Sequence, residues 1–394
     1  MNHQSKMQAK SCYSLSTDPY RAGIEIGQAL IDLQPEIVFL FSTIHYGGSP
    51  ELVEAIFELL DPQQTLLIGN TGDGFYERQK VGVAGVSALG INTHGAVKWH
   101  MAYEEGVGKM PYETTKRCLE KLHADCQENP PTLYFLTSDF RTDTNKIISA
   151  LQETALGPVV GGLAGDGYAF ENCFVYANTQ VLTDGIAVLA VEGEIPFQIH
   201  VAHELHPVGK PGEIAASQGT TIQIVDNIPA MDFIEQELGK PLDVIDQGII
   251  TFRITDRSNA KEGRILSLLL PEDRIKEKAV KLMGGVNQGN YAQVCLALPE
   301  KIIQDVRDIG VSLEKSPFKP MAAIIVSCAG RKKVLADNIA AELQEIIERC
   351  PSLMALAGFP SFGEFGPVKS SDGYSRSLFH NMTFILLLIG DQNL

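Results

Sequence analysis

The sequence predicts a mixed α/β (α+β) fold in which repeated β-α-β units form mixed sheets flanked by helices, arranged in two domains. Two observations indicate this fold. An apolar strand, an amphipathic helix and a second apolar strand occur in this order three times, and each copy ends in a glycine-rich turn that carries a carboxylate. The length of 394 residues also suits two or three domains with sizeable cores.

The first copy of the unit has predicted strands at 37–42 and 65–69, a helix at 49–60 and a turn at 70–76. The apolar residues of the helix recur at helical spacing and form one stripe, which a sheet must cover. They are Leu52, Val53, Ile56, Leu59 and Leu60.

The second and third copies follow the same order. The second has strands at 132–138 and 158–162 and a turn at 163–170, and its helix carries Ile147, Ile148 and Leu151. The third has strands at 322–328 and 353–358 and a turn at 359–367, and its helix carries Ile339, Leu343, Ile346 and Ile347. The repetition predicts one supersecondary unit used three times.

The intervening segments are rich in β-branched or alternating apolar residues and predict further strands. They are 81–91, 184–201, 248–256, 265–270 and 382–389. A turn-rich Asp-Asn-Ile-Pro sequence at 226–229 precedes a new helix, and we place the boundary between the two domains there, as 1–227 and 228–394.

The composition excludes several classes of partner and location. Lys and Arg total 32 against 48 Asp and Glu, a net charge of −16, which repels nucleic acid and anionic lipid. No apolar run is long enough to cross a membrane. The seven cysteines are scattered and the first twenty residues do not resemble a signal peptide, so we expect a cytoplasmic protein with no membrane partner.

Polar side chains gather at the carboxyl ends of the repeated strands, where ligands bind in β-α-β folds. The candidate ligand-binding residues are Ser42, Thr43, Asn70, Thr71, Asp73, Ser138, Asp139, Gly162, Asp166, Ser327, Cys328, Arg331, Ser361, Glu364 and Asn381. The alternative for each is structural, because glycines allow tight turns and carboxylates cap backbone amides. Neither a phosphate-binding loop nor a dinucleotide fingerprint is present.

Two further chemistries are possible on paper. Cys328 ends an apolar strand with Arg331 three residues later, so an enzyme with Cys328 as nucleophile is an alternative, although we expect no enzyme because no catalytic signature accompanies it. His200, His203 and His206 imitate a metal-ligand spacing, but a continuous strand would hold them apart, so we expect no joint metal site. A single axial histidine suffices for haem, and the candidates are His45, His200, His203, His206 and His380.

Several long blocks, in order, resemble the FIST family of intracellular signal-transduction proteins. The blocks at 327–335, 340–346, 358–368 and 379–388 are similar to the FIST C-terminal domain, and those at 69–74 and 158–193 to the FIST N-terminal domain. The resemblance covers nearly the whole chain.

The resemblance implies a sensory protein that binds a small ligand. FIST domains accompany histidine kinases, chemoreceptors and cyclic-dinucleotide enzymes, and no such output segment is visible here, so we expect signalling to a separate partner such as a histidine kinase. One group of similar FIST proteins binds haem and senses nitric oxide. Haem is therefore a possible cofactor, and a haem-based nitric oxide sensor is the first alternative.

Overall fold

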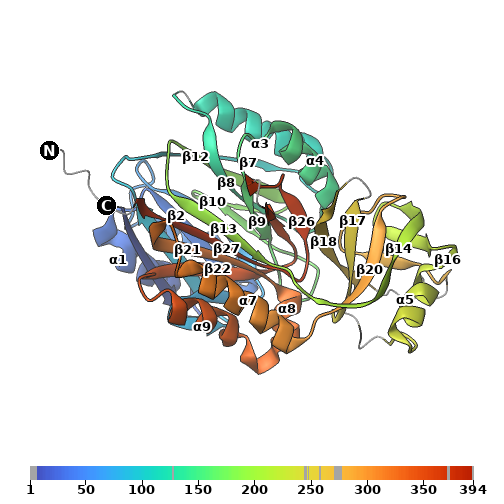
Figure 1. Ribbon diagram of the computed structural model, residues 1–394. Coiled ribbons are helices and arrows are strands. Elements are labelled where there is room, and N and C mark those ends of the chain that lie inside the picture. The colour runs from blue at the N-terminus through green and yellow to red at the C-terminus, as the bar shows by residue number, and fades with distance from the viewer. Residues whose placement is uncertain are drawn as a thin grey trace.

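The structure is a computed structural model that describes residues 7–126, 128–243, 246, 248–256, 259–269, 277–370 and 373–392. Figure 1 shows a large body of sheets and helices with a smaller, mainly β unit in yellow and green beside it. The predicted mixed α/β fold with mixed sheets and two parts is confirmed.

Three structural units build the large body. The first contains β1 (Gln8–Ser14), α1 (Pro19–Leu30), β2 (Ile37–Thr43), α2 (Glu51–Phe57), β3 (Leu66–Gly72) and β6 (Val86–Asn92). The second contains β7 (Lys98–Glu105), α3 (Pro111–Asp125), β8 (Pro131–Ser138), α4 (Thr144–Thr154), β9 (Val159–Leu163) and β12 (Gly185–Glu192). The third contains β13 (Phe197–Ala202), α7 (Pro299–Leu313), β21 (Phe318–Cys328), α8 (Ala329–Leu335), α9 (Ala340–Arg349), β22 (Ala355–Ser361) and β27 (Phe384–Gln392).

Each unit holds a parallel strand pair joined by helix, as the sequence predicts. The pairs are β2 with β3, β8 with β9 and β21 with β22. In every unit a later strand, β6, β12 or β27, adds antiparallel to the first strand of the pair. The three predicted β-α-β copies are therefore confirmed as equivalent structural units.

Short hairpins exchange between the units. They are β4 (Phe75–Glu77) with β5 (Lys80–Gly82), β10 (Val175–Ala177) with β11 (Gln180–Leu182), and β23 (Glu364–Gly366) with β26 (Leu378–His380), the last interrupted by the small ladder of β24 (Lys369–Ser370) and β25 (Gly373–Tyr374). The hairpin after β3 pairs with β22, the hairpin after β9 pairs with β3, and the hairpin after β22 pairs with β9. Each unit thus completes the sheet of another.

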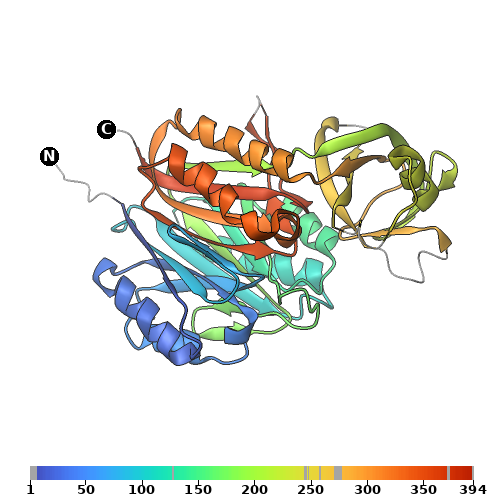
Figure 2. The same ribbon diagram turned by 90° about the horizontal axis from the view of Figure 1, so that it is seen from below.

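The exchange gives three six-stranded sheets with the same strand pattern. Their orders are β1-β6-β2-β3-β10-β11, β7-β12-β8-β9-β23-β26 and β13-β27-β21-β22-β4-β5. The helices α1 and α2 cover the outer face of the first sheet, α3 and α4 that of the second, and α7 and α9 that of the third. Figure 2 shows the blue helix α1 and the orange helices of the third unit on opposite sides of the sheets.

The central strands are apolar on both faces because both faces are covered. In β2, Phe39 and Phe41 point inward, whereas Val38 and Leu40 pack with α1 and α2. A strand between a helical layer and a second sheet has no solvated face, which explains the continuous apolar sequence Ile37–Phe41.

The inner core joins apolar side chains from all three sheets. The rings of Phe39 and Phe135 meet edge-on with centroids 5.2 Å apart, and Phe41 stacks on Phe359 at 4.8 Å. Each such aromatic pair contributes about 0.5–1.5 kcal/mol beyond its buried area. The contacts link the first unit to both others.

Residues 206–296 form an inserted unit between β13 and α7. Its sheet has the order β14-β20-β17-β18-β19-β15-β16. The strands are β14 (His206–Gln218), β15 (Thr221–Val225), β16 (Ile228–Pro229), β17 (Ile250–Asp256), β18 (Asn259–Leu269), β19 (Val280–Leu282) and β20 (Tyr291–Leu296), with helix α5 (Ala230–Leu238). The predicted strand pair near 248–256 and 265–270 is present as β17 and β18, except that residue 270 lies outside the described residues.

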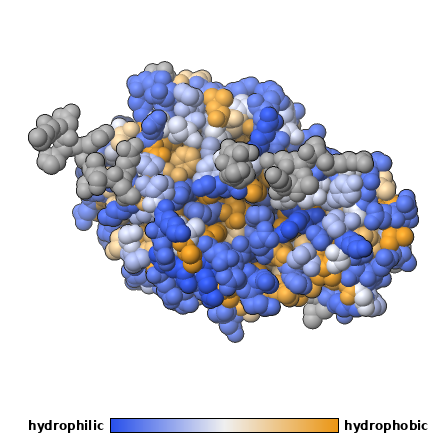
Figure 3. Space-filling model, viewed as in Figure 1, coloured by the Kyte–Doolittle hydropathy of each residue, from blue (hydrophilic) through white to orange (hydrophobic). Residues whose placement is uncertain are grey.

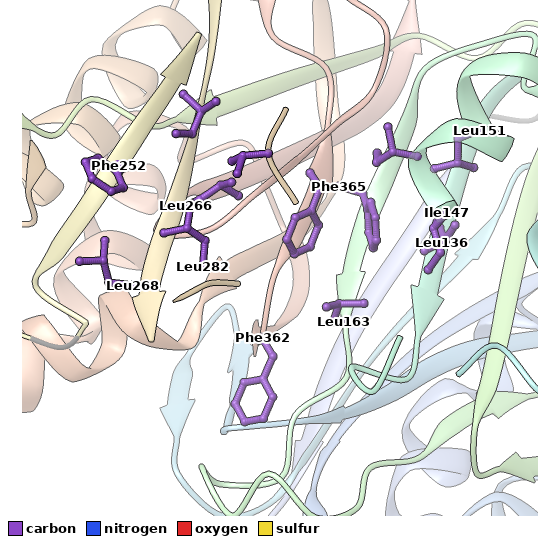
Figure 4. Close-up of a cluster of buried hydrophobic side chains, with 14 of the residues drawn as sticks. Leu136, Ile147, Leu151, Leu163, Phe252, Leu266, Leu268, Leu282, Phe362 and Phe365 are labelled. Atoms are coloured by element: carbon purple, nitrogen blue, oxygen red, sulfur yellow. The ribbon is translucent and has the colours of Figure 1, made fainter. Parts of the chain in front are cut away.

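Apolar packing attaches the inserted unit to the second unit. Figure 4 shows Phe252, Leu266 and Leu282 on one side and Leu136, Ile147 and Leu151 on the other, with Phe365 between them. All belong to one continuous buried cluster. A fully buried Phe or Leu contributes about 1.5–3 kcal/mol, so this cluster holds the two parts together.

The turn at 226–229 connects β15 to β16 within the inserted unit. Asp226 and Asn227 have positive φ angles, as a tight hairpin requires, and Val225 pairs with Ile228. The turn predicted from the sequence therefore lies in a hairpin inside one sheet. The division of the chain into domains at 1–227 and 228–394 stays a prediction.

One face of the molecule is mostly polar. Figure 3 shows hydrophilic residues over most of one face, with smaller apolar areas among them. Among the described residues, no helix combines the length and the apolar character that crossing a membrane requires.

The second strand of each parallel pair contains a glycine where the neighbouring strand leaves no space for a side chain. An added Cβ would lie 1.7 Å from Leu40 O at Gly69, 1.8 Å from Leu136 O at Gly161 and 2.1 Å from Ile325 O at Gly358. An aromatic residue of the exchanged hairpin pairs with each glycine, namely Tyr176, Phe365 and Tyr76 respectively. Each glycine therefore permits a close approach of the two parallel strands of its own unit.

We predict that Gly69→Ala lowers the free energy of unfolding by about 3 kcal/mol or more, because backbone atoms rather than a flexible side chain must move. Gly48→Ala is the matched control, since nothing lies within 4 Å of its added Cβ, and its effect should stay within about 0.5–1 kcal/mol. Urea unfolding of both variants measures the difference. Equal midpoints would contradict the close approach of β2 and β3.

Candidate functional site

Three chain segments meet where the second strand of each unit ends. The amide of Asp73 donates to Pro360 O at 3.1 Å, that of Gly165 to Thr71 O at 2.8 Å and that of Phe362 to Leu163 O at 3.2 Å. Each unit donates to a different unit, so the three bonds form a closed ring. We call Asp73, Gly165, Phe362 and their three acceptor residues the junction.

Asp73 is the one acidic side chain among the three donor residues of this ring. Its side chain is 3% exposed; Oδ1 accepts from the amide of Gly167 at 2.7 Å, and Oδ2 has no hydrogen-bond partner among the described residues. Burial raises the pKa of Asp73 to about 6, against the opposing effects of the Gly167 amide and the Lys332 ammonium group. A buried carboxyl oxygen without a partner is costly, and a ligand donor would satisfy it.

Lys332 and Tyr168 connect the junction to α8. The Lys332 ammonium group donates to Asp73 O, and burial lowers the pKa of Lys332 while the Asp73 carboxylate raises it. The Tyr168 hydroxyl donates to Ala329 O in the first turn of α8. The loop after β9 and helix α8 therefore hold one another beside Asp73.

An aromatic group extends from the junction to the surface. Phe362 is buried and contacts three other rings: Phe170 stacks on it at 4.7 Å, Phe140 meets it edge-on at 5.2 Å and Tyr168 lies at 5.9 Å. Tyr168 is 39% and Phe170 47% exposed. Figure 4 shows Phe362 directed away from Phe365 and the rest of the buried cluster.

The loop that carries Tyr168 and Phe170 has an unusual backbone. Both residues have positive φ angles, 67° and 56°, which bulky side chains rarely adopt. Such conformations cost about 1–3 kcal/mol each and gather at binding sites. The loop thus keeps two aromatic rings at the surface at a conformational cost.

Asp166 and Asp139 serve the backbone. Asp166 accepts from the amides of Phe170, Glu171 and Asn172, which closes the same loop. Asp139 accepts hydrogen bonds from the Arg141 amide and guanidinium group. Burial is the largest single effect on the pKa of Asp139 and raises it, but the contacts with Arg141 together outweigh burial and hold the pKa below its usual range. These two carboxylates have the capping role that the sequence leaves open.

Arg331 is fully buried and fully engaged. Its guanidinium group pairs with Glu342 at 2.7 Å and donates to Met382 O and Ile302 O, both at 3.1 Å. Ser327 donates to the other oxygen of Glu342 at 3.2 Å. The buried pair fastens α8 to α9 and α7, and the guanidinium group is turned away from solvent.

Cys328, Ser361 and Glu364 form a second buried polar group together with Thr383. Ser361 donates to Oε1 of Glu364, and Thr383 donates to Oε2 through its amide at 3.2 Å and its hydroxyl at 2.8 Å. Burial raises the pKa of Glu364 to about 8, and the hydrogen bonds oppose this. The Cys328 thiol is buried, and desolvation followed by the Glu364 charge raises its pKa, the opposite of what a nucleophile needs.

The remaining predicted residues lie inside the body. Asn70 accepts from Thr137 at 2.8 Å, and Thr71 accepts from the Phe174 amide at 3.1 Å, so both join neighbouring strands. A Cβ at Gly162 would lie 3.1 Å from Phe359. Three hydroxyls bond nearby protein groups: Ser42 with Tyr176, Thr43 with Gly85 O, and Ser138 with Asp139 O.

Asn381 fastens the inserted unit to the body. Its amide donates to Ile265 O at 2.8 Å, and its Oδ1 accepts from the Ser267 amide at 3.1 Å. The side chain is 1% exposed. Asn381 is therefore a joint between two parts of the fold.

Two of the five candidate haem histidines, His203 and His380, lie with ring centroids 6.4 Å apart. His45 and His206 are exposed, whereas His380 is fully buried, and burial lowers its pKa to about 3. β13 ends at Ala202 and β14 begins at His206, so the expectation of one continuous strand through the three nearby histidines is wrong. The reason is that the chain leaves the third sheet there to enter the inserted unit.

His380 does not fit a haem as an axial ligand. The closed packing around His380 leaves its ring no exposed edge, and neither of the two described surface cavities is lined by any of the five histidines. We derive no chemistry through this group.

Four residues of the site were missed by the sequence analysis: Lys332, Tyr168, Phe170 and Phe362. Lys332 lies next to the predicted Arg331, but α8 turns the two side chains in different directions. Tyr168, Phe170 and Phe362 lie in the predicted glycine-rich turns. The available signal was the gathering of aromatic residues in turns, where polar residues and glycine are usual.

The raised pKa of Glu364 predicts a pH effect. A carboxyl group whose folded pKa lies above its unfolded value stabilises the fold fully below about 4.5, and this stability is lost as pH rises through about 8. In the unchanged protein, the free energy of unfolding should therefore fall by on the order of a few kcal/mol as the pH rises. Glu364→Gln keeps a neutral hydrogen-bonding group at every pH, so this fall should be smaller in the variant. Urea unfolding at pH 5, 7 and 9 (buffer settings) measures it, and an unchanged pH profile would contradict the protonated state.

Comparisons with known proteins agree with the family expected from the sequence. A FIST N domain model matches residues 36–227 and a FIST C domain model matches residues 222–367. No curated protein matches the chain.

Solved structures give only weak likenesses. PurL of Thermotoga maritima in complex with ATP matches with 12% identity over 98% of this chain and 71% of that chain, at a TM-score of 0.22. PurLQS of the same organism matches with 11% identity over 98% and 72%, at 0.23. These scores carry no argument about fold or function. The two domain models together span residues 36–367, and the chain belongs to the FIST family, with a FIST N domain followed by a FIST C domain.

Proposed function

We propose that the chain is a sensory protein that binds a small ligand at the junction and signals to a separate partner. FIST domains are associated with sensory signalling, which supports the general class. The observation that carries the proposed site is Asp73, whose buried Oδ2 finds no hydrogen-bond partner in the described part of the chain and lies near exposed aromatic rings. It acts by binding rather than by catalysis.

The chemistry of the site describes the ligand. The Asp73 carboxylate favours a ligand with a hydrogen-bond donor, above all an ammonium group, because charge-assisted bonds are the stronger ones. Tyr168 and Phe170 offer ring faces and edges to an apolar or planar part of the same molecule. A small amine or amino acid meets both requirements.

Helix α8 is the proposed relay. It contacts the junction through Lys332 and Tyr168, and the apolar cluster around Cys328 and Leu335 joins it to Ile265 and Ala297, which lie in or beside the sheet of the inserted unit. A ligand that binds Asp73 better in one arrangement of α8 shifts the population toward that arrangement. The inserted unit then presents a changed surface.

The proposed partner is a histidine kinase or a cyclic-dinucleotide enzyme, and the proposed location is the cytoplasm. The net charge of −16 supports a protein partner over nucleic acid or an anionic membrane. No observation on the described residues favours a haem-based nitric oxide sensor or an enzyme with Cys328 as nucleophile.

We predict that Asp73→Asn weakens binding of amino acids or small amines identified in a thermal-shift screen. Loss of a charge-assisted hydrogen bond costs about 1.5–3 kcal/mol, or about 10- to 150-fold in affinity. Isothermal titration calorimetry with the best amine measures the change.

Asp32→Asn is the matched control, because it makes the same chemical change at an exposed position. It should bind like the unchanged protein. Circular dichroism and the unfolding midpoint verify that Asp73→Asn is folded. Equal affinities of the two variants would show that Asp73 does not contact the amine.

A further inference from the structure

A second group of side chains that can bind a metal lies on the outer face of the second sheet. It contains none of the junction residues. His100 lies on β7, Glu192 on β12 and Cys126 directly after the C-terminal end of α3. One nitrogen, one carboxylate oxygen and the sulfur of these residues all lie within 4.8 Å of one another. It is the one such group of His, Cys, Asp or Glu found in the part of the chain that the structure describes.

The fold itself brings the three residues together. Ala190 pairs with His100 and Glu192 pairs with Lys98, so His100 and Glu192 are diagonal neighbours on one face of the sheet. Ala190 belongs to the apolar cluster that packs beneath α3, which identifies the helix side of that sheet. The C-terminal end of α3 then places Cys126 above both.

Glu192 is fixed in its position by the backbone. Its side chain is 2% exposed, Oε1 accepts from the amides of Glu128 at 2.7 Å and Asn129 at 2.9 Å, and Oε2 lies 2.7 Å from His100 Nε2. The hydrogen bonds of Oε1 have a structural role, because they cap two backbone amides. This role does not explain why an imidazole and a thiol lie around Oε2.

We propose that His100, Cys126 and Glu192 bind a divalent transition-metal ion, with Zn²⁺ as the best match. Zn²⁺ takes His nitrogen, Cys sulfur and carboxylate oxygen at about 2.0–2.3 Å, which places tetrahedral ligand atoms about 3.3–3.8 Å apart. The three donor atoms all lie within 4.8 Å of one another, which is close to that spacing. Ca²⁺ and Mg²⁺ do not match, because they require oxygen ligands throughout.

The hydrogen bonds of Glu192 supply the support that metal ligands need. The two backbone amides orient the carboxylate through Oε1, as outer-sphere hydrogen bonds do in metal sites. The same bonds hold the chain that follows Cys126. The arrangement is therefore largely formed before an ion binds. A bound ion would replace the hydrogen bond between His100 Nε2 and Oε2.

Three protein ligands leave the fourth tetrahedral position open. Cys126 also lines a surface cavity of about 250 Å³, together with His123, Glu128, Asn129, Pro130, Pro131 and Leu156. The cavity brings solvent to the thiol side of the group, so water or a small exogenous ligand can take the fourth position. Zinc sites with three protein ligands have this open form, whereas structural sites are closed by four.

The test is metal binding by the full chain. Purified protein, stripped with a chelator and then titrated with Zn²⁺, should bind one ion per chain that survives dialysis, as measured by inductively coupled plasma mass spectrometry. Titration with Co²⁺ should give a thiolate-to-cobalt charge-transfer band and the intense visible bands of a tetrahedral ion.

Cys126→Ser should abolish the charge-transfer band and weaken Zn²⁺ binding by at least about tenfold. Cys12→Ser is the matched control, because Cys12 is also a free, half-buried cysteine and lies on β1, an edge strand of the first sheet. This substitution should leave both signals unchanged. His100→Gln provides a second variant whose Cys126 thiolate remains, and it should weaken binding to a similar degree.

Absence of a stoichiometric ion, or an ion retained equally by Cys126→Ser and the unchanged protein, would overturn the site. The result is independent of ligand binding at the junction, since Asp73→Asn should bind Zn²⁺ like the unchanged protein. Failure of either proposal therefore leaves the other standing.

Discussion

The fold depends on the exchange of hairpins among the three units. Without the exchange, β3, β9 and β22 would be edge strands with unpaired backbone groups, which is costly inside a protein and favours aggregation. Because each sheet is completed by a hairpin from another unit, no unit can form its full sheet alone. The pairing of β4 with β22 joins residues nearly three hundred positions apart in the printed sequence, so folding requires long-range contacts throughout.

The three glycines allow the two parallel strands of each unit to lie close together beside the incoming hairpin. At Gly69, Gly161 and Gly358 the adjacent strand lies too close for a side chain, and an aromatic residue of the incoming hairpin pairs with each glycine. Aromatic residues next to strand glycines recover buried area that glycine itself cannot supply. The requirement is local in space but is distributed over distant parts of the sequence.

The sequence was sufficient to predict the three β-α-β units but not the contacts that connect them. Helical and strand periodicities arise from neighbouring residues, so the three β-α-β copies were predicted from short segments. The roles of Arg331, Glu364 and Asn381 depend on Glu342, Thr383 and Ile265, whose proximity is a result of tertiary packing. Asp73 was predicted from the turn, yet its difference from Asp166 lies in one unpaired oxygen that no local pattern reveals. The exchanged strands β4, β10 and β23 are three residues long and give no periodic signal.

The divergence of the three units makes the cyclic arrangement chemically asymmetric at the junction. Asp73, Gly165 and Phe362 occupy equivalent places in the ring of backbone hydrogen bonds, but their side chains differ completely. The first unit supplies a carboxylate and the third an aromatic ring. The second supplies space, because a Cβ at Gly165 would lie only 3.1 Å from Asp73 Oδ1. Identical residues would have put three like charges or three rings at one point, so the loss of sequence equivalence gives the meeting point of three backbones the asymmetric chemistry on which the proposed binding position depends.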